Sequence, residues 1–321
     1  MSNRRRFLIS DGMAAVGNVA DAVFYDSYKD RFVTMAPDEI TSVISGYTPI
    51  GVVVIPASHD VYGDGTCGVM SLAEMNRSTP DTGSSDYKKN YWGGLNIDIS
   101  LTNYSAVNYI GTGSTLNNGV VQGTHSAAYL PSDGFSNVTG LDGVSNYYST
   151  DSSYRQAPSP YNADGSRNEA YYTTAYSTAN VLSDFDGVGN TAVLTDLATS
   201  QGDWKTATTI THSSDAGYYP AACCCWRFHT EGTEQGQWYL PAMGELGYVI
   251  NRISAINTTI NKVKSVYSSV VAVALDTANY MWYLSSSEYD TDCARFLSSG
   301  NGYVGYNGKG YTYYVRAFLR V

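Results

Sequence analysis

Short hydrophobic runs near the start of the chain predict strands. Residues 50–55 form a continuous run of Ile, Gly and Val, which is typical of a strand buried on both faces. Pro56 ends this run, and the apolar residues of 67–72 predict a second strand. Residues 19–35 predict two shorter strands around a polar turn at 27–30. We expect that small hairpin to stand ahead of the main domain.

Residues 184–204 favour a helix over a metal-binding loop. Asp184 and Asp186 resemble the start of a calcium loop, but Thr195 stands where that loop needs an acidic residue. The alternative is a helix with Asn190 as its N-cap. The residues expected to face inward are Val193, Leu194 and Leu197.

Helical spacing over residues 241–263 predicts a longer helix. Pro241 stands at its start, where proline is favourable because the first N–H groups of a helix have no partner within it. The apolar positions that recur at this spacing are Leu246, Val249, Ile250, Ile253, Ile256, Ile260 and Val263.

The C-terminal residues predict a set of β-hairpins. Gly300-Asn301 and Asn307-Gly308 are turn dipeptides, and Asn-Gly is the strongest short hairpin signal. With Asn307-Gly308 as a two-residue turn, Tyr306, Tyr311 and Tyr313 share one face, because side chains directly opposite each other point the same way. The expected pairs are Tyr306 with Lys309, Val304 with Tyr311, and Gly302 with Tyr313.

Residues 76–180 show no helical periodicity and are rich in Ser, Thr, Gly, Asn and Tyr, so they predict either a loop-rich insertion or a set of short irregular strands. The chain of 321 residues holds 29 Tyr against 8 Phe and 5 Trp. That is more tyrosine than a core needs, because each buried hydroxyl requires a partner. We therefore expect many of these rings on an ordered surface.

Charge and hydropathy exclude several classes of partner. Only 15% of the residues are charged and the net charge is −10, which leaves no basic face for nucleic acid. No apolar run is long enough to cross a membrane. Arg4, Arg5 and Arg6 resemble the start of an export signal, but polar residues interrupt the apolar run behind them. We expect this basic tip to dock onto another protein.

The sequence predicts neither a catalytic nor a metal site. The five cysteines include the consecutive Cys223 to Cys225 and no Cys-x-x-Cys pair, so we interpret them as small buried hydrophobes. His59 and Asp60 form a lone pair with no nucleophile motif. We expect a protein that is not an enzyme and holds no cofactor.

The terminal hairpins instead have the composition of a binding face. Tyr, Ser, Gly and Asn dominate antibody combining sites, because tyrosine gives a large contact area and the small residues give adaptable hydrogen bonds. Four or five exposed aromatic rings would cover the roughly 800 Å² that one partner buries in a standard interface.

The segment 236–246 carries a family resemblance. Gly-Gln-Trp-Tyr-Leu-Pro followed by Gly-Glu-Leu resembles the W-x-L-P…E-L signature of the C-type lectin fold, formylglycine-generating-enzyme type. Residues 285–288 (Ser-Ser-Ser-Glu) and 315–318 (Val-Arg-Ala-Phe) resemble the strands that follow this signature, and residues 50–55 and 68–72 resemble the first strands. The resemblance implies an α+β, C-type-lectin-like fold with mixed and antiparallel sheets and two main helices.

The same resemblance implies a division of the chain. Residues 1–44 would be an N-terminal attachment segment with a short β-hairpin, and residues 45–321 a ligand-binding domain. Within that domain, 76–180 would be the loop-rich insertion and 280–314 a variable region.

Within this fold, the chain is most similar to variable proteins of diversity-generating retroelements, especially tail-fibre or receptor-binding proteins of phages that infect gut anaerobes. Such elements mutate template adenines, so that Asn codons come to encode Tyr, Ser, Gly, Asp and other residues. The resemblance implies that Trp282, Glu288 and Lys309 belong to a fixed scaffold. The candidate diversified, ligand-binding positions are Tyr280, Tyr283, Tyr289, Asp290, Thr291, Asp292, Cys293, Phe296, Tyr303, Tyr306, Gly308, Tyr311 and Tyr313.

The resemblance implies a receptor-binding protein displayed on a phage tail as a homotrimer. It would bind a protein or glycan on a bacterial cell surface, and its N-terminal segment would contact other tail proteins. The alternatives are a bacterial surface protein diversified by the same machinery and an oxidase of the formylglycine-generating type. The calcium-binding tripeptides of sugar-binding C-type lectins are absent, and Cys293 lacks the nearby cysteine that the oxidase would need.

Overall fold

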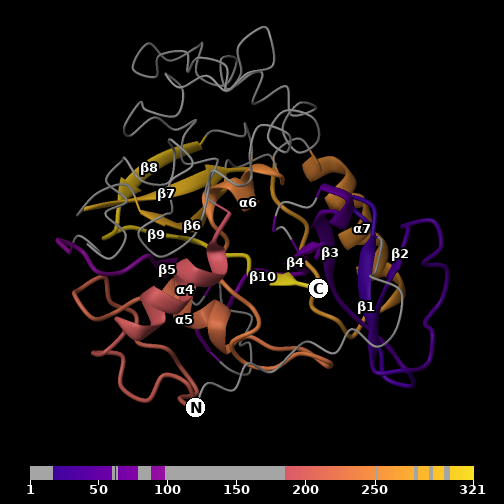
Figure 1. Ribbon diagram of the computed structural model, residues 1–321, viewed down its shortest axis with the longest axis horizontal. Coiled ribbons are helices and arrows are strands. Elements are labelled where there is room, and N and C mark those ends of the chain that lie inside the picture. The colour runs from indigo at the N-terminus through magenta and orange to yellow at the C-terminus, as the bar shows by residue number, and fades with distance from the viewer. Residues whose placement is uncertain are drawn as a thin grey trace, which may run out of the picture.

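The computed structural model describes residues 17–59, 62, 64–78, 88–97, 185–249, 252–277, 281–288, 292–299 and 304–321. Within these residues the chain forms two five-stranded sheets, with helices packed around them (Figure 1). The fold is therefore of the α+β class, with mostly sheet content.

The first sheet holds both ends of the described chain. Its order is β10-β4-β3-β1-β2, and all of its pairs are antiparallel. Its strands are β1 (Ala22–Asp26), β2 (Arg31–Met35), β3 (Tyr47–Ile55), β4 (Gly68–Ser71) and β10 (Phe318–Arg320). The central strand β3 is buried from Pro49 onward, which confirms the strand predicted from its β-branched run.

The predicted hairpin of residues 19–35 is confirmed as β1 and β2, which pair from Ala22 with Met35 to Asp26 with Arg31. It does not stand apart from the rest of the fold. Strand β1 also pairs with β3, and Phe24 packs against Tyr47 and Tyr267. Residues 17–44 therefore share a sheet and a core with the residues that follow.

The second sheet carries the C-terminal strands in the order β5-β9-β6-β7-β8. Its strands are β5 (Lys89–Tyr91), β6 (Trp282–Glu288), β7 (Cys293–Ser298), β8 (Val304–Gly308) and β9 (Thr312–Tyr314). Strands β6 and β9 are parallel, and the other pairs are antiparallel. Because β5 comes from the segment read as a loop-rich insertion, part of that segment belongs to the sheet.

The predicted pairing around Asn307-Gly308 is wrong. Strand β8 pairs with β7, and β9 pairs with β5 and β6, so two strands separate β8 from β9. The chain does turn after Gly308, but Lys309 is drawn into the interior by an ion pair with Glu288 at the end of β6. With this contact buried, the chain crosses the end of the sheet after Gly308, and β9 pairs with β5 and β6 rather than with β8.

Four α-helices lie within the described residues: α4 (Gly187–Asp196), α5 (Pro220–Arg227), α6 (Met243–Gly247) and α7 (Ile253–Val266). A short 3-10 helix, η1, spans Ala57–His59. In Figure 1, α7 lies over the first sheet, while α4 and α5 lie beside the second sheet.

Two details of the predicted helices are corrected. The N-cap of α4 is Asp186, whose carboxylate accepts the Gly189 N–H at 3.0 Å, whereas Asn190 is buried and donates to Ser286 Oγ at 3.1 Å. The single helix expected over 241–263 is divided into α6 and α7. Tyr248 and Arg252 donate to carbonyls three residues back, as in a tight turn that interrupts an α-helix.

The core has two clusters, and each draws side chains from both sheets. One cluster contains Phe24 and Val52 of the first sheet, with Tyr283 and Leu297 of the second. The other contains Val53, Leu284 and the helix α5 cysteines among its members. Both sheets therefore contribute side chains to each of the two clusters, so they pack together as one unit.

Candidate functional site

The exposed aromatic residues of the C-terminal region lie at the end of β8. Tyr306 is 40% exposed within the strand, and Tyr311 is 62% exposed just beyond it. The Tyr311 N–H donates to the Gly308 carbonyl at 3.0 Å and closes the turn between them. Asp292, at the start of β7, is also exposed. We call Asp292, Tyr306, Gly308 and Tyr311 the β8 end surface.

Lys309 anchors the β8 end surface from the interior of the protein. Its side chain is buried, forms an ion pair with Glu288, and donates to the Ile97 carbonyl at 2.8 Å. Its ammonium also lies 4.8 Å from the centre of the Trp92 ring. The Lys309 N–H donates to the Asp292 carbonyl at 2.7 Å. Glu288 and Lys309, both expected to belong to the scaffold, are thus joined in a single buried contact.

Tyr306 and Tyr311 share one face of the second sheet. Tyr306 pairs with Arg295 of β7, whose guanidinium lies 5.8 Å from the Tyr306 ring centre. Gly308 is two residues along the same strand and therefore points to the same side. A Cβ added at Gly308 would meet the Tyr311 ring, so this ring lies on that side too.

Tyr313 lies on the opposite face, which corrects the expected cluster of three tyrosines. Its ring stacks on Phe296 at 5.6 Å, and the Trp282 ring lies within 5.4 Å. Phe296 follows Arg295 in β7, so the two side chains point to opposite faces. Burial raises the pKa of Tyr313 to about 12, the nearby Tyr311 also raises it, and a hydrogen bond with Asn307 lowers it. Tyr313 is half-buried.

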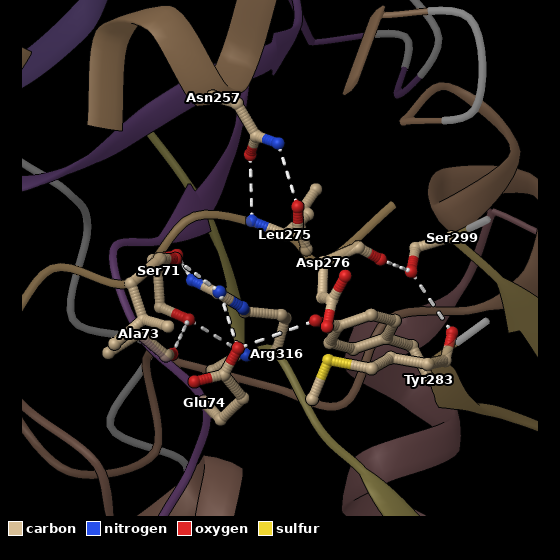
Figure 2. Close-up of polar contacts among 12 residues, drawn as sticks. Ser71, Ala73, Glu74, Asn257, Leu275, Asp276, Tyr283, Ser299 and Arg316 are labelled. Carbon is tan, nitrogen blue, oxygen red and sulfur yellow. Dashed lines mark hydrogen bonds and ion pairs between the residues drawn. The ribbon is translucent and has the colours of Figure 1, made fainter. Parts of the chain in front are cut away.

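Two candidate binding residues are buried and are not presented to a ligand. Phe296 is one of three mutually contacting rings, with Trp282 and Tyr313 as the others. Tyr283 points into the core, where its hydroxyl donates to Glu74 at 3.3 Å and its pKa is raised by burial (Figure 2). The expectation that these rings are exposed is wrong, because β6 and β7 are covered on both faces beyond their first residue.

Glu74 and Arg316 form the buried ion pair at the centre of Figure 2. The Arg316 guanidinium lies 2.6 Å from the Glu74 carboxylate and also donates to the carbonyls of Ser71 and Val273. Because Tyr283 belongs to β6 and Ser71 to β4, this cluster links the two sheets. Arg316 belongs to the Val-Arg-Ala-Phe segment expected as a strand, but residues 315–317 connect β9 to β10 and only Phe318 of that segment lies in a strand.

A neighbouring set of hydrogen bonds holds the connection into β6. Asn257 of α7 donates to the Leu275 carbonyl and accepts the Leu275 N–H, both at 2.7 Å. The Ser299 hydroxyl bonds the carbonyls of Asp276 and Met281 (Figure 2). These contacts fix one end of the strand pair β6–β7, where β6 begins and β7 ends.

Five candidate positions, Tyr280, Tyr289, Asp290, Thr291 and Tyr303, lie outside the described residues. Cys293 is half-buried at the start of β7 and pairs with Gly308. Of the predicted set, the structure brings together Asp292, Cys293, Tyr306, Gly308 and Tyr311.

Sequence reasoning missed the contribution of residues 95–97. Ile97 is 39% exposed and its carbonyl accepts from Lys309, while Leu95 lies beside Gly310. An aliphatic edge therefore flanks the turn that carries Tyr311. No local signal could have placed it there, because the contact joins segments separated by 212 residues.

The signature segment packs in the interior around Glu245. This carboxylate accepts the Ala242 N–H at 2.7 Å and the Tyr239 hydroxyl at 2.8 Å, and it lies 3.8 Å from the Arg320 guanidinium. Burial raises the pKa of Glu245 to about 7, against the opposing effect of Arg320. Trp238, also buried, donates to Thr233 Oγ1. The Glu245 and Trp238 side chains are fully enclosed, so the role of this cluster is to stabilise the fold.

The cysteines are confirmed as buried hydrophobes at Cys67 and Cys223 to Cys225. Burial raises the pKa of the Cys224 thiol to about 12 and also raises that of Cys223 and Cys225. Such thiols stay protonated and are poor nucleophiles. No group of three or more His, Cys, Asp or Glu side chains within the described residues could hold a metal ion. No helix in that part of the chain is long and apolar enough to span a bilayer.

Comparison with known proteins gives little further guidance. No family model and no curated protein match the chain. The solved structure of a fimbrial protein from Bacteroides ovatus ATCC 8483 is similar to it, with a TM-score of 0.44 and 16% sequence identity. The similarity covers 95% of this chain and 49% of that protein, so the chain spans about half of its length. A similarity this low assigns neither a fold family nor a function.

Proposed function

We propose that the chain is a receptor-binding protein of a phage tail, which binds a ligand on the bacterial cell surface through the β8 end surface. The observation that carries the proposal is the contrast between a buried lysine, Lys309, and an exposed ring, Tyr311. The lysine is buried and paired, while Tyr311, two residues later, is 62% exposed. A stiff base under an exposed aromatic ring is the arrangement that limits the entropy lost on binding.

The proposed fold is the C-type-lectin-like fold of the formylglycine-generating-enzyme subclass. Its support is the placement of the signature residues. Trp238 and Glu245 lie in the shared interior, and Arg316 links the two sheets. Such a frame would leave the end of β8 free to vary in sequence without loss of the fold.

The diversification of this surface by a retroelement is part of the proposal. Its support is that the exposed surface carries residues that a mutated asparagine codon can encode, namely Gly308, Asp292 and Tyr311. Lys309 and Glu288, which such a codon cannot encode, are buried. The downstream DNA tests this directly. A near-copy of the terminal codons with adenines at the positions of the β8 end surface is expected, and intact, identical codons there would oppose diversification.

Cell binding tests the function. Fluorescently labelled protein is incubated with intact cells from a panel of gut anaerobes, and bound protein is measured by flow cytometry. We expect strain-selective binding, which Tyr306→Ala and Tyr311→Ala each weaken by about tenfold or more. Tyr28→Ala is the matched control, because Tyr28 is 73% exposed but lies in the turn between β1 and β2.

Two results would count against the proposal. If Tyr28→Ala weakens binding as much as Tyr311→Ala, the β8 end surface is not the recognition site. If no strain binds the wild-type protein in its native oligomeric form, the receptor-binding role fails. The proposed homotrimer, which would multiply weak contacts by avidity, is measured by light scattering on the same samples.

A further inference from the structure

The Tyr311 ring occupies the space that a side chain at position 308 would need. A Cβ built on Gly308 would lie 3.2 Å from both Cδ2 and Cε2 of Tyr311, and 3.9 Å from the Asp292 carbonyl oxygen. A carbon–carbon contact of 3.2 Å is closer than the optimum of about 3.5–4.0 Å. Any residue other than glycine therefore competes with the ring for this position.

The backbone around Gly308 cannot easily yield. The Lys309 N–H donates to Asp292, the Lys309 side chain is buried with Glu288, and Gly308 pairs with Cys293 across the strands. The Tyr311 ring is mostly exposed and turns about two χ angles. The ring is therefore the part that moves when position 308 gains a side chain.

Gly310 provides the contrast within the same turn. A Cβ at Gly310 would meet Leu95 Cδ2 at 3.6 Å, which is an ordinary contact. Both glycines flank Lys309. A side chain at 308 therefore crowds the tyrosine ring, whereas a side chain at 310 makes an ordinary contact with Leu95.

We infer that residue 308 sets the position of the Tyr311 ring, so that positions 308 and 311 act as one specificity unit. An alanine at 308 shifts the ring by a few tenths of an ångström, and a larger side chain displaces it from the end of β8. The effect on recognition rests on the proposed function, whereas the placement of the ring does not. Change at a glycine would then alter specificity without the glycine itself contacting the ligand.

NMR tests the placement without any ligand. In the wild-type protein we expect a nuclear Overhauser effect between the Tyr311 ring protons and the Gly308 Hα protons, together with a ring-current shift of Gly308 that Tyr311→Leu abolishes. Gly308→Ala should move the Tyr311 ring resonances by more than Gly310→Ala does, because only a Cβ at 308 is shown to crowd the ring. Absence of that effect, or equal perturbation by both glycine variants, would overturn the inference.

A double-mutant cycle on cell binding tests the specificity unit. With a strain that binds the wild-type protein, we expect Gly308→Ala to weaken binding about threefold and Gly310→Ala less than about twofold. Gly308→Ala combined with Tyr311→Leu should be no weaker than Tyr311→Leu alone, because the glycine acts through the ring. Additive losses would refute the unit. If no strain binds, the proposed function fails, and the NMR result still decides the ring placement.

Discussion

Two buried ion pairs of this protein have nearly the same chemistry and different surroundings. The side chains of Arg316 and Glu74 are 0% and 3% exposed, and those of Lys309 and Glu288 are 0% and 2% exposed. Arg316 is enclosed by carbonyls of the first sheet and its neighbouring loop. Lys309 instead lies within two residues of the most exposed ring of the C-terminal region.

The comparison shows that the burial of an ion pair does not by itself indicate which parts of the fold the pair connects. The Arg316 pair ties one sheet to the other. The Lys309 pair ties a turn and the segment 95–97 to the end of one sheet. A buried, paired residue and an exposed residue can therefore lie within a few positions of each other in the chain. This arrangement places an exposed surface directly on a stable base.

The largest expected effect is the loss of the central pair. Arg316→Met leaves the Glu74 carboxylate buried without its cation, which should lower the free energy of unfolding by about 3–5 kcal/mol. Urea denaturation with an unchanged m-value measures this loss. The double variant Arg316→Met/Glu74→Gln, which removes both charges, should recover most of it. A loss below about 1 kcal/mol for the single variant would show that the pair does not hold the sheets together.

Loss of the outer pair should cost less and remain local. Lys309→Met should destabilise the fold by about 2–3 kcal/mol, because water can reach Glu288 once the turn at the sheet end opens. Hydrogen exchange should rise in residues 92–97 and 308–311 while the first sheet stays protected. Exchange that rises equally in both sheets would mean that the two pairs have the same role.

The buried Glu245 should make stability depend on pH. Its pKa of about 7 in the folded protein lies above its ordinary value of 4.5, so the folded state holds the proton more tightly than the unfolded chain does. Its contribution to stability is complete below pH 4.5 and is lost as the pH rises through 7. Glu245→Gln keeps acceptors and donors for Ala242 and Tyr239 but cannot ionise.

The wild-type protein should therefore lose on the order of 2 kcal/mol more than Glu245→Gln between pH 4.5 and about pH 8, as measured by urea denaturation. The exposed Glu234→Gln is the control and should follow the wild-type curve. Identical curves for the wild type and Glu245→Gln would show that Glu245 is ionised throughout.

The smallest effect is expected at the exposed rings. Tyr311→Ala should change the free energy of unfolding by no more than about 0.5 kcal/mol, because little of the ring is buried. Tyr306→Ala should cost up to about 1 kcal/mol, since its ring lies over Arg295. Calorimetry at matched protein concentration measures both. A loss of several kcal/mol at Tyr311 would place the ring among the core residues and remove the distinction between the two regions.

Several elements could be predicted from local patterns. The runs at 50–55 and 68–72 gave the correct strands because β-branched residues buried on both faces leave an uninterrupted apolar signal. The hairpin of β1 and β2 followed from its polar turn. The division of the predicted helix into α6 and α7 was missed, because the hydrophobic spacing continues across the interruption.

The candidate site was only partly predictable. Tyrosine and glycine in the terminal strands predicted an exposed aromatic surface, and Tyr306, Gly308 and Tyr311 do lie together at β8. Tyr283 has the same side chain and lies in the core, because its hydroxyl reaches Glu74, which is 209 residues away. Nothing within the terminal segment distinguishes these tyrosines.

The sequence by itself determined the early strands and the burial of Cys67 and Cys223 to Cys225, because each depends on the composition and periodicity of a short segment. The tertiary structure alone decided which tyrosines face solvent and how β8 and β9 are placed. The physical reason is that a strand pattern separates two sets of side chains without saying whether one set or both will be covered, and β6 and β7 are covered on both faces. Here that choice was made by long-range partners, above all Glu74 for Tyr283 and the Glu288–Lys309 pair beneath Tyr311.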